Sequence, residues 1–211
     1  MFRLSVSCVL IMALCGSCRR TLPDDAPVQE KKEKPVTVVP TVCVYTLGNV
    51  DRRLQKAMMD SLQAHYPKCR MMGDIGLRDN ELTKKRNDHR RYRADLLNKR
   101  LSGYKTDSTI VIGLTQEDIG LDDFRGRPHS GIMGQASGIG SGVAVFSSYR
   151  PRGYGQLFSV MVHEIGHAQG LKHCPDAHCL MQNAKGGNPF SKTNVFCDKC
   201  KAHMISKHWK F

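Results

Sequence analysis

The stretch MVHEIGHAQGLKHCPDAHCLM, residues 161–181, holds four histidines, two cysteines and one glutamate. Helical geometry sets residues four apart on one face. A helix over residues 157–170 therefore turns the imidazoles of His163 and His167 towards one metal ion. Glu164 lies about 100° round this helix from His163, where it is poorly placed to be a ligand. From there it can accept a proton from a metal-bound water.

The continuation of this motif supplies a third ligand. Gly170 can adopt the left-handed conformation that ends a helix and turns the chain, which brings His173 back towards the metal. Three neutral imidazoles favour zinc, leave its fourth position for water, and lower the pKa of that water to about 7. The pattern H-E-x-x-H-x-x-G-x-x-H therefore predicts zinc-dependent hydrolysis of peptide bonds, with Glu164 carrying the proton to the leaving amine.

Four of the nine cysteines cluster late in the chain, in a C-x4-C and a C-x2-C pair: Cys174, Cys179, Cys197 and Cys200. Two close pairs of thiolates are typical of a structural tetrahedral zinc site. The first of these cysteines follows His173 directly, so closing this site would fix that histidine. We therefore predict two zinc ions per chain, one catalytic and one structural.

Disulfides are the alternative for the cysteines of an exported protein, with Cys174 joined to Cys179 and Cys197 to Cys200. Cys43 and Cys69 would approach each other if their two strands are neighbours, or they are buried free thiols.

The N-terminus reads as an export signal. Residues 1–18 contain the apolar run LSVSCVLIMALC after Arg3, and Gly16 and Ser17 precede Cys18 as small residues precede the modified cysteine of a bacterial lipoprotein. We predict lipidation at Cys18 and a place in the cell envelope or periplasm. Plain cleavage, retention as an anchor and a fortuitously apolar N-terminus are the alternatives. Residues 19–40, rich in proline and charge, would be a tether, and residues 41–211 the metallopeptidase domain.

The chain is basic, with 32 Lys and Arg against 19 Asp and Glu and a net charge of +13. Residues 84–93 and the C-terminal KCKAHMISKHWK carry much of this excess. A basic face can attract anionic lipid or acidic peptides, or only aid solubility. No aromatic-interleaved nucleic-acid motif accompanies the charge, so we expect no nucleic-acid partner. We expect a monomer.

Hydrophobic patterns upstream indicate an α/β fold. Patterns typical of strands occur at residues 41–46, 68–73, 108–114 and from 143 onward. Patterns typical of amphipathic helices occur at residues 50–66 and 91–101. The run STIVIGL at 108–114 is apolar throughout, which predicts a strand at the centre of the sheet.

Together, HEIGHAQGLKHC, PDAHCLM and CDKC resemble the signature of the archaemetzincin family of zinc metallopeptidases. The resemblance implies a compact α/β domain with a mixed, mostly parallel sheet, an active-site helix, a zinc-stapled C-terminal lobe and a cleft along an antiparallel edge strand. By position, His163, His167 and His173 resemble the catalytic zinc ligands and Glu164 the general base. The four late cysteines resemble the second zinc site. Met181 resembles the Met-turn residue beneath the histidines, or is ordinary core filling.

Two functions from different classes follow. A peptidase would bind an extended peptide along residues 142–147 by strand addition. A zinc-stabilised binding or scaffold protein at the cell envelope would use the same histidines without turnover. Glu164 favours the enzyme, because a scaffold has no use for that carboxylate.

Overall fold

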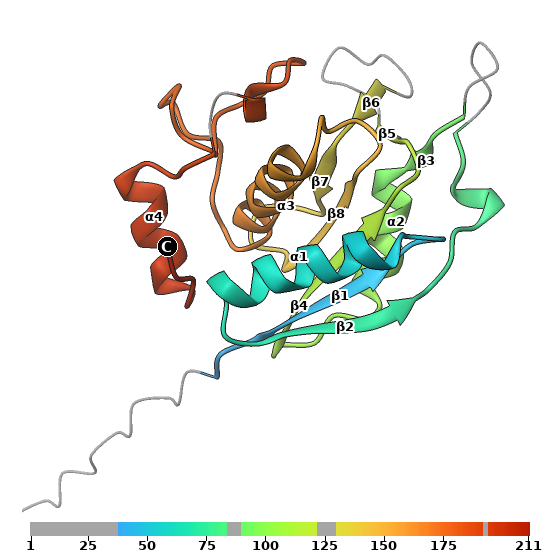
Figure 1. Cartoon of the computed structure of the whole chain (residues 1–211), viewed down its shortest axis with the longest axis horizontal. Coiled ribbons are helices and arrows are strands. Elements are labelled where there is room, and N and C mark those ends of the chain that lie inside the picture. The colour runs from blue at the N-terminus through green and yellow to red at the C-terminus, as the bar shows by residue number, and fades with distance from the viewer. Residues whose placement is uncertain (1–37, 84–89, 122–129, 192–193) are drawn as a thin grey trace, which may run out of the picture. The chain divides into compact units, whose positions relative to one another are not determined.

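Five strands form the main sheet of the computed structural model, which describes residues 38–83, 90–121, 130–191 and 194–211 (Figure 1). Their order across the sheet is β2-β1-β4-β8-β7. The first three pairings are parallel, and only β7 runs antiparallel to its neighbour β8. The strands are β1 Thr41–Thr46, β2 Cys69–Asp74, β4 Thr109–Thr115, β7 Gly134–Ala136 and β8 Val143–Ser147. The predicted mixed, mostly parallel sheet is confirmed.

Strand β4 lies at the centre of this sheet, as its apolar run predicts. Its apolar side chains alternate between two hydrophobic cores, with Ile110 and Ile112 in one and Val111 in the other. All three are at most 4% exposed. A strand buried on both faces needs apolar residues at every position, which explains why no polar residue interrupts VIGL.

The helices cover both faces of the sheet (Figure 1). α1 and α3 pack on one face with the larger core, and α2 packs on the other. The side-chain carboxylate of Asp51 caps α1 by accepting hydrogen bonds from the backbone N–H groups of Arg53 and Leu54, at 2.8 and 3.1 Å. The helices are α1 Arg52–His65, α2 Ala94–Ser102, α3 Tyr154–Ala168 and α4 Asp198–Ser206, with 3-10 turns η1 Asp79–Glu81 and η2 Pro189–Ser191.

A second, three-stranded sheet lies beside α2 and was not predicted. It consists of β3 Tyr92–Arg93, β5 Ile119–Leu121 and β6 Ser130–Ile132. Next to β5, the buried carboxylate of Asp118 forms ion pairs with Arg91 and Arg150, at 2.9 and 2.7 Å. Because these strands are two or three residues long, hydrophobic periodicity gives them no signal.

The predicted edge strand is wrong. Residues 143–147 form β8, which pairs with β4 on one side and β7 on the other, and every residue of β8 is buried. Among the described strands the antiparallel edge is β7, within the glycine-rich passage. The sequence GQA has little β-propensity, so it does not predict a strand. The alternating residues of β8 do, which is why the edge strand was predicted there.

Cys43 and Cys69 lie on neighbouring strands but do not pair. The register sets Val42 opposite Cys69, and Cys43 opposite Arg70. Because side chains alternate across a sheet, this offset of one residue sends the two thiols to opposite faces. Both are free, with Cys43 buried and Cys69 half-buried.

The predicted signal at 1–18 with Cys18, most of the tether, and residues 84–89 of the basic run lie outside the described residues. Within the described part of the chain, no helix has both the length and the apolar composition to cross a membrane.

Candidate metal centres and active site

Helix α3 brings His163 and His167 together on one face, with their Nε2 atoms 3.0 Å apart. The Nδ1 atom of each ring forms a hydrogen bond with a backbone carbonyl. That of His163 donates to the carbonyl of Leu180, and that of His167 to the carbonyl of Leu171, both at 2.7 Å. A protonated Nδ1 leaves Nε2 with a free lone pair, so both rings are oriented to bind a metal.

His173 completes this group, as the glycine turn predicts. Gly170 has φ of +108°, in the left-handed region, and the N–H of Leu171 returns to the carbonyl of Gly166 at 2.8 Å. The ring of His173 then lies 4.7 Å from that of His167 and 5.7 Å from that of His163, between centroids. The ligand nitrogens of the three histidines all lie within 4.8 Å of one another.

The environment of these imidazoles keeps them neutral. Burial, together with a smaller effect of the neighbouring His167, lowers the pKa of His163 to about 3. Burial also lowers the pKa values of His167 and His173 below the ordinary 6.5. Neutral imidazole is the form that ligates zinc, so the three residues fit the metal that their pattern predicts.

Glu164 lies buried beside the histidines, against strand β7. Its burial raises the pKa of its carboxyl from 4.5 to about 8, and a hydrogen bond from the backbone N–H of Ala136 opposes this rise. A Cβ atom at Gly134 would come within 2.6 Å of Cγ of Glu164. Gly134 therefore makes room for the carboxylate, a role that the sequence did not reveal.

Met181 is fully buried and packs against helix α3, which carries His163 and His167. A Cβ atom at Gly166 would stand 2.7 Å from its sulfur. A glycine inside a helix costs about 1 kcal/mol relative to alanine, so such a position has a packing reason. Here the reason is the thioether of Met181.

The four late cysteines meet at a second centre. Their sulfur atoms lie within 4.8 Å of one another, and those of Cys174 and Cys197 are 3.8 Å apart. Tetrahedral zinc with Zn–S bonds of about 2.3 Å sets its sulfurs about 3.8 Å apart. Sγ of Cys179 also accepts hydrogen bonds from the N–H groups of Met181 and Cys197, both at 3.4 Å. None of the six described cysteines forms a disulfide, so this donor set fits zinc rather than the alternative pairing.

Comparison with known proteins places this architecture among metallopeptidases. The model of the matrixin family matches residues 56–197. Archaemetzincin from Aeropyrum pernix is 33% identical over 54 residues, and that from Pyrococcus abyssi is 28% identical over 106 residues. These alignments cover 25% and 43% of this chain, and the chain spans only 30% and 50% of the two relatives.

The fold is similar to that of solved archaemetzincins. The crystal structure of archaemetzincin from Methanopyrus kandleri superposes with a TM-score of 0.64 at 22% identity. The match covers 82% of this chain and 98% of that protein.

Proposed function

Because this chain belongs to the matrixin family of zinc metallopeptidases, we propose that it hydrolyses peptide bonds at the centre formed by His163, His167 and His173. Together with this family match, the similarity to curated and solved archaemetzincins confirms the resemblance to that family. The observation that carries the proposal is the position of Glu164. It is a buried carboxylate next to the three-histidine group, packed against Gly134 of the edge strand β7.

The three histidines would hold zinc, each through a nitrogen with a free lone pair. A bound zinc ion supplies a Lewis acid that polarises the substrate carbonyl and acidifies a water molecule. The backbone carbonyls of Leu180 and Leu171 keep the rings of His163 and His167 in the binding orientation. Such partners strengthen metal binding and fix the ligand geometry.

Glu164 would move the protons. Its carboxylate accepts a proton from the attacking water and delivers it to the nitrogen of the leaving amine. Gly134 leaves space for the side chain, and the N–H of Ala136 holds the carboxylate at the edge of β7. Burial favours the protonated carboxyl, so the group is suited to both accepting and returning a proton near neutral pH.

Strand β7 would bind the substrate backbone. The N–H groups of Ser147 and Ser137 bond the carbonyls of Met133 and Val143 across β7 and β8, at 2.8 and 2.9 Å. In an antiparallel ladder such pairs alternate, so the backbone groups of Gly134 and Ala136 face away from β8. The N–H of Ala136 already bonds Glu164. An extended peptide paired with β7 would place its carbonyls beside Glu164 and the histidines.

The four-cysteine centre would hold the second zinc. We propose that it stabilises the C-terminal lobe and takes no part in the reaction, because four thiolates leave no open position for substrate. It would also fix the position of His173 in the active site, because Cys174 follows that histidine directly.

The test is cleavage of a diverse peptide mixture by the zinc-loaded chain, with new termini identified by mass spectrometry. Glu164→Gln is the matched control, because it keeps the size of the side chain and removes its charge. We expect cleavage by the wild type and none by the variant at equal zinc content. If neither zinc-loaded protein cuts any peptide, the peptidase proposal is wrong and the zinc-stabilised binding protein is favoured.

A further inference from the structure

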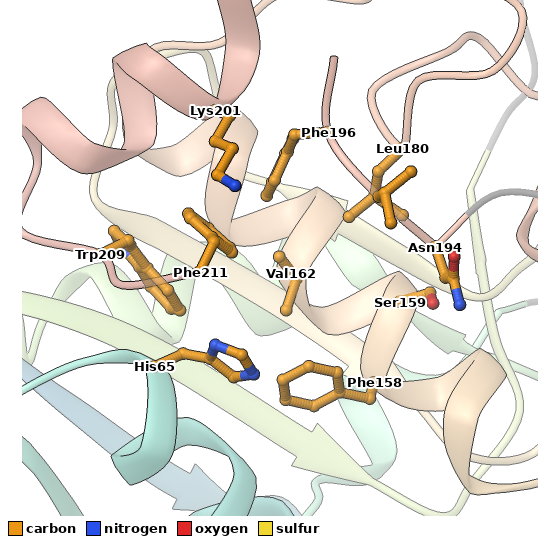
Figure 2. Close-up of a pocket in the computed structure, with 11 residues that line it drawn as sticks. His65, Phe158, Ser159, Val162, Leu180, Asn194, Phe196, Lys201, Trp209 and Phe211 are labelled. Atoms are coloured by element: carbon orange, nitrogen blue, oxygen red, sulfur yellow. The ribbon is translucent and has the colours of Figure 1, made fainter. Parts of the chain in front are cut away.

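A cavity of about 330 Å³ lies between α1, α3 and the C-terminal segment, apart from both metal centres (Figure 2). None of the three histidines, Glu164 or the four cysteines lines it. At about 30 Å³ for a water-sized group, it has room for roughly eleven non-hydrogen atoms. This volume lies at the lower end of the range typical of small-molecule sites.

Five of the eleven residues that line it carry an aromatic ring. Phe211 packs against Phe196, Trp209 and His65, with ring centroids 5.2, 6.4 and 5.9 Å apart. His65 also contacts Phe158 on α3, at 5.6 Å. Val162 and Leu180 add aliphatic surface. An occupant must therefore present an apolar body to the cavity.

The polar groups of the wall select the charge of that occupant. Among the described residues, no acidic side chain lines the cavity, and none forms an ion pair with Lys201. Figure 2 shows the side chain of Lys201 reaching from α4 towards the space beside Phe196 and Phe211. The Ser159 hydroxyl is already used, donating to the carbonyl of Gly155 at 3.0 Å. Lys201 is therefore the group best placed to bind an anion.

We propose that this cavity is a binding site for a medium-chain monocarboxylate, with its apolar chain among the aromatic rings and its carboxylate on Lys201. Desolvating a lone ammonium beside apolar surface is unfavourable, and a carboxylate compensates for it. A cationic amphiphile of the same length would meet the same rings and be repelled by the lysine. The cavity contains no metal ligand and no general base of the peptidase proposal. The two share only Leu180, whose side chain lines the cavity and whose backbone carbonyl bonds His163.

The chain carries its own probe of this site, because Trp209 is its only tryptophan and lines the cavity. Decanoate has a size that matches the cavity and should bind with one-to-one stoichiometry. We expect 10-bromodecanoate to quench Trp209 fluorescence saturably, because the bromine would lie against the indole. Decan-1-ol should bind several-fold more weakly, and decyltrimethylammonium should not compete.

Lys201→Met and Lys199→Met form a matched pair, because both lysines flank Cys200 and only Lys201 lines the cavity. We expect about fivefold weaker decanoate binding for Lys201→Met, the upper size for a partly exposed ion pair, and no change for Lys199→Met. Zinc content and thermal unfolding of both variants establish that the fold is intact. Equal affinity of the two variants, equal binding of decanol, or quenching that does not saturate would each overturn the proposal. So would quenching by brominated phosphatidylglycerol vesicles without any binding of free decanoate.

Discussion

The backbone carbonyl of Leu180 accepts a hydrogen bond from Nδ1 of His163 over 2.7 Å, and this contact joins the two candidate metal centres. Leu180 follows Cys179 directly, and its own N–H donates to the carbonyl of Val195 at 2.7 Å. The cysteine centre thus fixes the segment whose carbonyl orients a histidine of the active site. Loss of the structural metal should therefore weaken metal binding at the histidine centre.

Cys197→Ser tests this connection. We expect the zinc content to fall from two ions to one, and the free energy of unfolding to fall by more than about 4 kcal/mol, as for loss of a structural metal. The remaining zinc should be held about 10- to 100-fold more weakly, because the Leu180 carbonyl is no longer fixed. Elemental analysis and chelator competition measure both effects.

Cys69→Ser is the control for this variant, since Cys69 is a half-buried free thiol outside both centres. It should keep both zinc ions. Two zinc ions in Cys197→Ser would show that the four cysteines are not a metal site.

Glu164→Gln should change how the stability of the metal-free protein depends on pH. Burial raises the pKa of Glu164 in the folded protein to about 8, above its ordinary value of 4.5. The stability associated with the protonated carboxyl is fully present below pH 4.5 and is lost as the pH rises towards 8. Glutamine cannot ionise, so the variant escapes this loss.

We therefore expect the metal-free variant and wild type to be equally stable at pH 4.5, and the variant to be a few kcal/mol more stable at pH 8. The lowered pKa of His163 affects both proteins alike, so it cancels in the comparison. Urea unfolding at the two pH values measures the difference. Bound zinc should shrink it, because a nearby cation favours the carboxylate. A difference that is the same at both pH values would contradict the assignment.

Gly134→Ala should impair the reaction without removing the metal. Its methyl group would meet Cγ of Glu164 at 2.6 Å, so the carboxylate must shift. A displacement of about 1 Å can cost up to about 100-fold in rate, and we expect a 10- to 100-fold loss of kcat/KM at unchanged zinc content. Gly138→Ala, where the nearest atom lies 4.0 Å away, should leave kcat/KM unchanged. Equal activity of the two variants would show that Gly134 does not position Glu164.

The sequence predicted the parts of the site that one helix and one turn determine. The spacing of His163 and His167 follows from helical geometry, and the place of His173 follows from the left-handed turn at Gly170. The central strand β4 could be predicted equally well, because a strand that is buried on both faces needs an unbroken apolar run.

What the sequence did not reveal depends on contacts between distant segments. The role of Gly134 exists only because β7 packs against α3, and a glycine in a three-residue strand carries no pattern of its own. The edge strand was misplaced for the same reason. The aromatic cavity combines His65, Phe158 and Phe211 from three separate segments, and no local motif links them.

Gly166 and Met181 provide a final test, in which one substitution should change the sign of its effect. In the wild-type background, Gly166→Ala places a methyl group 2.7 Å from the sulfur of a fully buried methionine. Overpacking of this kind costs about 1 to 3 kcal/mol, which outweighs the gain of about 1 kcal/mol from alanine's helix propensity. With Met181→Ala the obstructing side chain is gone, so Gly166→Ala should stabilise that background by up to about 1 kcal/mol. Urea unfolding of the four zinc-loaded proteins completes the cycle. If Gly166→Ala destabilises both backgrounds equally, Met181 is not the reason for a glycine in this helix.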